Sequence, residues 1–135
     1  MSVPLTKRGE QKFEVLLKAH DLAAYTIKAA SSEKVIPKRY RWCSSAKLVD
    51  AAVDIDRYLT MANSLNLFDE TSAKQRRAYQ DLAYAASESL LSMLDIAYNA
   101  FSIDSEKIDT WTGLVVNVQS LIENWIKSDE RRQKG

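Results

Sequence analysis

The sequence predicts an all-α fold, an up-down-up-down antiparallel four-helix bundle that forms a single domain over residues 1–135. Apolar residues recur at steps of three and four along almost the whole chain, which is the period of one face of a helix. Only three Gly and two Pro occur among the 135 residues, whereas the many turns of an all-β fold need such residues. The expected helices are long and their connections short, which favours antiparallel neighbours.

The first two helices are expected over residues 9–31 and 38–65, separated by Pro37, since proline disfavours helical geometry in the residue before it. The inward stripe of the first contains the single histidine, His20, which we expect to be a hydrogen-bonded core residue rather than a general base. The stripes comprise Phe13, Leu16, His20, Ala23, Ile27 and Ala30 in the first helix and Leu48, Ala52, Ile55, Leu59 and Ala62 in the second.

The third and fourth helices are expected over residues 71–101 and 105–128, followed by a polar tail over 129–135. Residues 69–72 offer capping side chains and acidic charge to the third helix, and Asp104 or Ser105 can cap the fourth. The inward stripes comprise Tyr79, Leu82, Ala86, Leu90, Met93, Ala97 and Phe101, then Ile108, Trp111, Val115, Val118, Ile122 and Trp125.

A second set of apolar residues remains outside these stripes. One reading makes them the edges of wide core-facing stripes, and the other makes them an exposed face through which copies of the chain form a homo-oligomer. On the second reading the interface contains Tyr58, Tyr84, Leu91 and Tyr98, with Ala51 and Leu65 on the same faces.

The composition excludes several kinds of site. One His and one Cys cannot form a His/Cys zinc cluster, a thiol redox pair or an internal disulfide. There is no glycine-rich phosphate loop, no Gly-x-Ser-x-Gly elbow and no Glu-x-x-His pair. We therefore expect no enzymatic activity, no metal and no cofactor. The unpartnered cysteine and the absence of a long apolar segment predict a cytoplasmic protein without a membrane partner.

The placement of charge is more informative than the net charge of +1. Residues 34–49 contain five bases and no acid, whereas residues 78–110 contain six acids and one base. In an up-down bundle the basic residues 34–41 and the acidic residues 104–109 lie at the same end, where they are expected to neutralise each other in part. The opposite end collects Lys7, Arg8, Lys12, Lys74, Arg76, Arg77, Arg131, Arg132 and Lys134.

These cations have two interpretations: a solvated, solubilising surface or a surface that holds a phosphate backbone. Beside the bases only Tyr40 and Trp42 offer aromatic rings. Nucleic-acid contacts would therefore be mostly to phosphate, which positions a strand without reading its sequence.

Four segments carry a resemblance to a known family. They are LLKAHDLAAYTI, the connection VIPKRYRW, the helix SSAKLVDAAVDIDRYLTMAN and the C-terminal LIENWIKSDERRQKG. Together they resemble small four-helix-bundle proteins, which include the accessory variability determinants of diversity-generating retroelements and proteins encoded in intervening sequences of bacterial 23S ribosomal RNA genes. The second group often has an Asn-Ile-Ala-Glu-Gly-like segment where this chain has residues 55–58, so the retroelement branch fits better.

The resemblance implies a barrel-shaped homopentamer that binds nucleic acid, RNA or RNA/DNA, together with a reverse transcriptase, as a non-catalytic scaffold for cDNA synthesis. Of the expected nucleic-acid-binding residues, Lys38, Arg39 and Arg41 lie in the matched connection and Arg131 and Arg132 in the matched tail. The charge distribution alone adds Arg76 and Arg77. The alternative is a self-associating helical module that binds only protein.

Overall fold

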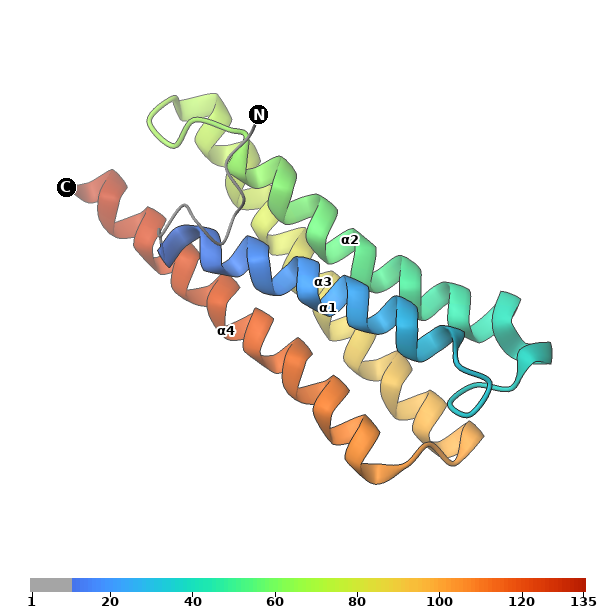
Figure 1. The fold of residues 1–135 in the computed structure, drawn as a ribbon. Helices are drawn as coiled ribbons and strands as arrows, with labels where there is room; N and C mark the ends of the chain where they lie inside the picture. Colours follow the sequence, from blue (N-terminus) through green and yellow to red (C-terminus); the bar gives the residue numbers. More distant parts are fainter. Residues whose placement is uncertain (1–10) are drawn as a thin grey trace, which may run out of the picture.

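The computed structural model describes residues 11–135, which form four long helices and no strand. The helices are α1 (Gln11–Ser31), α2 (Ala46–Asn63), α3 (Glu70–Phe101) and α4 (Ser105–Lys134). They lie lengthwise beside one another (Figure 1), and the principal contacts join α1 and α3 each to α2 and α4. The predictions of an all-α fold and a helical bundle are confirmed. Within the described residues, no helix combines the length and hydrophobicity needed to cross a membrane.

Several predictions lie outside the described residues or side chains: the start of the first helix at Gly9, the core position Phe13 and the cations Lys7, Arg8 and Lys12.

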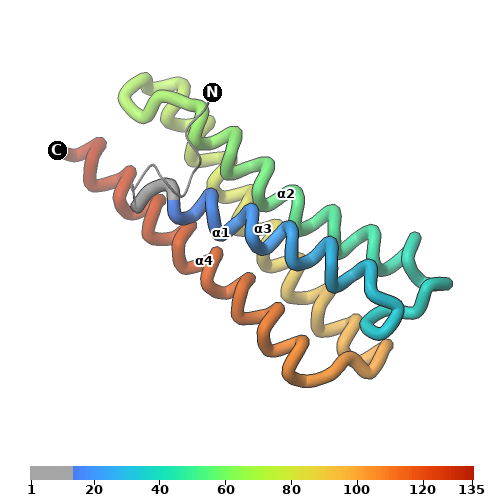
Figure 2. The backbone as a smooth tube through the Cα atoms, in the orientation of Figure 1, coloured from blue at the N-terminus to red at the C-terminus, as the bar shows by residue number. Residues whose placement is uncertain are grey.

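The connection between α1 and α2 forms the tip of one end of the bundle (Figure 2, cyan to teal), and the α3–α4 connection lies at that same end. The predicted start of the second helix at residue 38 is wrong, because a 3-10 turn, η2 (Lys38–Tyr40), and a π-helical turn, η3 (Arg41–Ser45), precede α2. Pro37 has the extended geometry of φ −55° and ψ 141°. Its carbonyl accepts from the Tyr40 N–H at 2.9 Å, which closes a 3-10 rather than an α turn.

Aspartates cap the last two helices, as the sequence predicted. The Ser72 N–H donates to Asp69 at 3.0 Å, and the Lys107 N–H donates to Asp104 at 3.3 Å. The first of these hydrogen bonds lowers the pKa of the Asp69 carboxyl below its ordinary value. Ser102, at the end of α3, has φ 52°, in the left-handed region that favours glycine.

The core confirms the stripes predicted on α2 and α4, apart from Ile108, which is only partly buried. Trp111 is completely buried, and its Nε1–H donates to the Thr26 hydroxyl at 3.0 Å. The buried residues predicted in all four helices include Leu16, Ile55, Leu90, Val118 and Trp125.

The predicted faces of α1 and α3 are wrong in part. His20 is exposed and lies within hydrogen-bond distance of Asp56 on α2, while Ile27 and Leu82 are each 45% exposed. The inward face of α1 instead contains Val15, Leu22 and Thr26, and that of α3 contains Gln80, Ala83 and Ser87. The prediction followed apolar side chains, but these inward faces include polar residues that are hydrogen-bonded inside the bundle. Gln119, for example, donates to Ser87 at 2.9 Å.

Candidate nucleic-acid interface

Five cations project from the connection between α1 and α2 and the first turn of α2, and we call them the basic corner. All five are exposed: Lys34, Lys38, Arg39, Arg41 and Lys47. Within the described part of the chain, Arg41 is the only one in an ion pair, at 3.8 Å from Glu33, and it also donates to the Ser31 carbonyl at 3.2 Å. The basic corner therefore presents cations that residues 11–135 leave largely without ion-pair partners.

Two aromatic rings accompany these cations in different ways. The Tyr40 ring packs against Phe101 at a centroid distance of 5.2 Å, and the Arg39 guanidinium lies 5.1 Å from its centre. Trp42, in the π-helical turn, is 81% exposed. Tyr40 thus anchors the corner to the end of α3, whereas the Trp42 indole stands in solvent.

The acidic residues at the same end do not neutralise the basic corner through ion pairs. Asp104, Glu106 and Asp109 are exposed, and among residues 11–135 none of them pairs with a cation of the corner. Asp104 instead caps α4. The expected neutralisation of the basic corner by these acids therefore does not occur through ion pairs in the described residues.

At the opposite end, the prediction that Arg76 binds nucleic acid is wrong, because this residue is only 6% exposed. Its Nε and Nη2 donate to the two oxygens of buried Asp129 at 2.7 and 2.9 Å. Its Nη1 donates to the Leu65 carbonyl at 3.2 Å, and its guanidinium lies over the Trp125 ring at 4.9 Å. Gln80 adds a hydrogen bond to Asp129 at 3.0 Å. The pair fastens α4 to α3 and to the connection between α2 and α3.

α4 extends to Lys134 and contains the buried Asp129, so the predicted helix end at residue 128, with a tail over 129–135, is wrong. The residue continues the inward stripe four positions beyond Trp125, the spacing of one helical turn. Extending the predicted inward stripe of the fourth helix by four residues beyond Trp125 would have reached Asp129.

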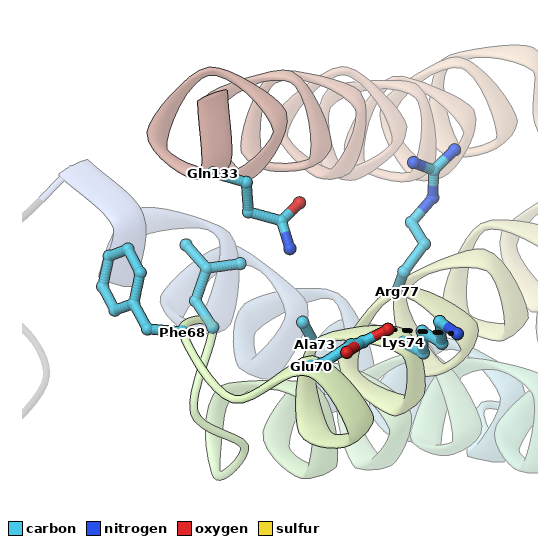
Figure 3. Close-up of a pocket in the computed structure, with 7 residues that line it drawn as sticks. Phe68, Glu70, Ala73, Lys74, Arg77 and Gln133 are labelled. Carbon is cyan, nitrogen blue, oxygen red and sulfur yellow. Dashed lines mark ion pairs between the residues drawn. The ribbon is translucent and has the colours of Figure 1, made fainter. Parts of the chain in front are cut away.

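The other cations of this end are largely paired. Arg77 lies 3.0 Å from Asp81 and 3.5 Å from Glu130, and its bond to Asp81 raises the pKa of the guanidinium. Lys74 pairs with Glu70 at the edge of a groove of about 420 Å³ between α3 and Gln133 of α4 (Figure 3).

The basic residues predicted in the tail divide into two kinds. Arg132 lies 4.0 Å from Asp129 and 5.6 Å from the centre of the exposed Phe68 ring. Arg131 and Lys134 are exposed and form no ion pair within the described residues. This end therefore carries fewer uncompensated cations than its sequence indicates.

Three of the four residues predicted for self-association line grooves on the surface. Tyr58 stacks on Tyr79 at 6.2 Å beside a groove between α2 and α3. Leu91 and Tyr98 line a second groove between α3 and α4. Tyr84 is partly buried, and this desolvation, together with Glu123 and Glu88, raises the pKa of its hydroxyl.

A different row of α3 residues is more exposed and contains no charge. It follows the 4-3-4-3-4 spacing of a helix-packing seam. This α3 outer stripe consists of Ala78, Leu82, Ala85, Ser89, Ser92 and Ile96.

Three carboxylates of α3 lie on one exposed row of the helix. Asp81, Glu88 and Asp95 are exposed, as predicted for a solvated stripe. Within residues 11–135 there is no group of three or more His, Cys, Asp or Glu side chains arranged to hold a metal ion.

No family model, curated protein or solved structure matches the chain.

Proposed function

We propose that this chain is a non-enzymatic, cytoplasmic accessory protein that binds RNA or an RNA/DNA hybrid through the basic corner and serves as a scaffold for a reverse transcriptase. The observation that carries the proposal is the concentration of exposed cations at one tip of the molecule, where only Arg41 forms an ion pair within the described residues. The up-down-up-down topology and the assembly into a homo-oligomer, five subunits by resemblance, belong to the same proposal.

Local charge rather than net charge supports this assignment. Binding to phosphates releases counterions, and its strength follows the cations that are free to replace those counterions. At the opposite end Arg76 and Arg77 are held by carboxylates, so a phosphate there would compete with an existing partner. A homo-oligomer would repeat the basic corner and raise avidity, even though each chain has a net charge of only +1.

The experiment is a salt titration of binding to structured RNA and to an RNA/DNA hybrid, with two charge-matched double variants. Lys38→Glu with Arg39→Glu changes the basic corner, and Arg131→Glu with Lys134→Glu changes the other end by the same total charge. Each phosphate contact contributes about −0.7 to −0.9 to the slope of log affinity against log salt. The first variant should lose affinity for unrelated sequences alike and flatten the slope by about 1.4 to 1.8, through two lost contacts.

The second double variant is the control, because its residues are also exposed but lie near the C-terminus, at the opposite end (Figure 1). It should retain most of the slope. Equal losses in both variants would assign binding to the whole surface rather than to the basic corner. A parent protein that shows no salt-dependent binding to either ligand would refute the nucleic-acid function.

The reverse transcriptase requires its own test. A gene for such an enzyme beside the coding sequence would identify the partner, and co-purification of the two proteins after nuclease treatment would establish a direct contact. Loss of the enzyme on nuclease treatment would show that nucleic acid alone connects them.

A second candidate function, a self-associating module that binds only protein, is favoured by the charge-free α3 outer stripe. Ile96 in this stripe is 65% exposed and Leu82 is 45% exposed. Light scattering at micromolar concentration gives the mass, and a mass of one chain would refute self-association. Leu82→Lys tests this stripe and Leu91→Lys tests the interface predicted from the sequence. The variant that lowers the mass while leaving helicity intact identifies the interface.

A further inference from the structure

Trp42 has an unusual environment for its residue type. Tryptophan is highly buried on average in folded proteins, and the other two tryptophans of this chain follow that rule, with Trp111 at 0% and Trp125 at 4% exposure. Trp42 is 81% exposed. Its indole therefore contributes little to the core, and the fold leaves a large flat aromatic surface in water.

The position of Trp42 is fixed by its backbone. It is the second residue of the π-helical turn η3, which follows the 3-10 turn η2 directly. π-helical turns are rare and are frequently found at functional sites. The Tyr40 ring packs on Phe101, and Cys43 Sγ donates to the Tyr40 carbonyl at 3.5 Å. Trp42 therefore lies between Tyr40, which packs on α3, and Cys43, which bonds to Tyr40. It is on a helical turn rather than on a free loop.

The charged residues nearest to Trp42 in the sequence are cations. Lys38, Arg39 and Arg41 precede it and Lys47 follows it, while Glu33 is the only acidic residue in 22–49. An exposed aromatic ring among cations is the combination that binds single-stranded nucleic acid, because the cations hold the phosphates while a base stacks on the ring. A paired base inside a duplex does not expose its face in this way.

We infer that Trp42 is a stacking platform for an unpaired nucleobase, so that the basic corner binds single-stranded RNA or DNA in preference to a duplex. This inference rests on the proposed function, since the strand is held first by its phosphates. It adds to that function a preference for unpaired strands that the cations alone would not produce. A second copy of this chain is the alternative occupant of the indole, and the experiment separates the two.

The experiment uses three probes of equal length: a single strand, the corresponding duplex and a strand of abasic nucleotides that has phosphates but no bases. Trp42 is the solvent-exposed tryptophan, so quenching of the emission accessible to acrylamide reports on it. The single strand should quench this emission, whereas the abasic strand should bind without quenching it.

Trp42→Ala should weaken single-strand binding by about 5- to 150-fold, the range expected for losing one stacked base. Its binding to the abasic strand and its salt slope should stay unchanged, because no phosphate contact is lost. Trp42→Phe should restore part of the affinity. Since the side chain is 81% exposed, far-UV circular dichroism of both variants should match the parent, which excludes misfolding.

The outcomes distinguish this inference from the proposed function. Unchanged single-strand affinity in Trp42→Ala, with salt-dependent binding intact, would overturn the stacking platform and leave the proposed function standing. A parent that binds none of the three probes would overturn both. Trp42 emission that shifts with protein concentration alone, together with a rising mass, would overturn the platform and assign the indole to contact between copies of the chain.

Discussion

Replacing Arg76 by Met should destabilise the protein strongly, although its sequence context indicates a surface cation. The guanidinium and the Asp129 carboxylate each retain only 8% side-chain exposure. Without Arg76, the buried Asp129 carboxylate keeps only the Gln80 hydrogen bond at 3.0 Å and the more exposed Arg132 at 4.0 Å. Breaking a buried ion pair by removing one partner costs about 3–5 kcal/mol. A domain of this size is typically stable by about 5–15 kcal/mol, so the loss is a large share of the total. Arg76→Met also removes the donor to the Leu65 carbonyl, whereas Gln80 keeps its hydrogen bond to Asp129.

The assay is urea unfolding of a double-variant cycle, followed by circular dichroism. Arg76→Met and Asp129→Leu should each lower the free energy of unfolding by about 3–5 kcal/mol. The double variant should lose much less than the sum, since neither charge then remains buried alone. Arg77→Met is the matched control: its ion pairs are about half exposed, and exposed pairs contribute about 0–1 kcal/mol. Additive losses, or an Arg76→Met variant that unfolds like the parent, would refute the buried pair.

Three further predictions test the helices. Val118→Asp places an unpaired carboxylate at a position that is 1% exposed, and should cost more than the about 2–5 kcal/mol typical of truncating a buried Leu or Ile; a melting temperature like the parent's would show that the register of α4 is wrong. Gly113→Ala should raise the free energy of unfolding by about 0.5–1 kcal/mol, because a Cβ there meets nothing within 4 Å; a lower urea midpoint would contradict this. Asp69 stabilises the fold above its unfolded-state pKa and loses that effect as the pH falls through its lowered folded-state pKa; the urea midpoint of Asp69→Asn should therefore decline less than the parent's below about pH 4, and identical acid profiles would exclude the cap as a contributor.

The fold was predictable where apolar side chains alone define the inward face. On α2 and α4 the stripes through Ile55 and Val118 are buried as expected. On α1 and α3 the inward faces include Thr26, Gln80 and Ser87, whose polar side chains give no hydrophobic signal. Their burial depends on partners in other helices, such as Trp111 and Gln119. A periodicity of single residues does not contain that pairing information.

The sequence was enough to identify the cations of the candidate site, but not to tell which of them are exposed and free of ion pairs. The sequence shows Arg39 and Arg76 as equivalent cations, because both follow a basic neighbour or precede one. Only the fold reveals that Arg76 meets Asp129, which is 53 positions away in the chain, while Arg39 forms no ion pair within the described residues. Exposure of Trp42 was equally hidden, since its environment depends on a π-helical turn that no local pattern signals.

The uneven pairing of charges also explains how a chain of net charge +1 can present a cationic surface. Carboxylates at the end that holds the C-terminus are used for structure: Asp129 fastens α4 to α3, and Asp81 and Glu130 pair with Arg77. At the other end Glu33 pairs with Arg41, Asp104 caps α4, and Glu106 and Asp109 stand in solvent without an ion pair to the basic corner in the described chain. Net charge counts both ends alike, whereas a phosphate backbone responds to cations that are exposed and uncompensated within about one Debye length, ~8–10 Å at physiological salt. The relevant quantity for binding a phosphate backbone is therefore the local excess of exposed, unpaired cations at the tip between α1 and α2.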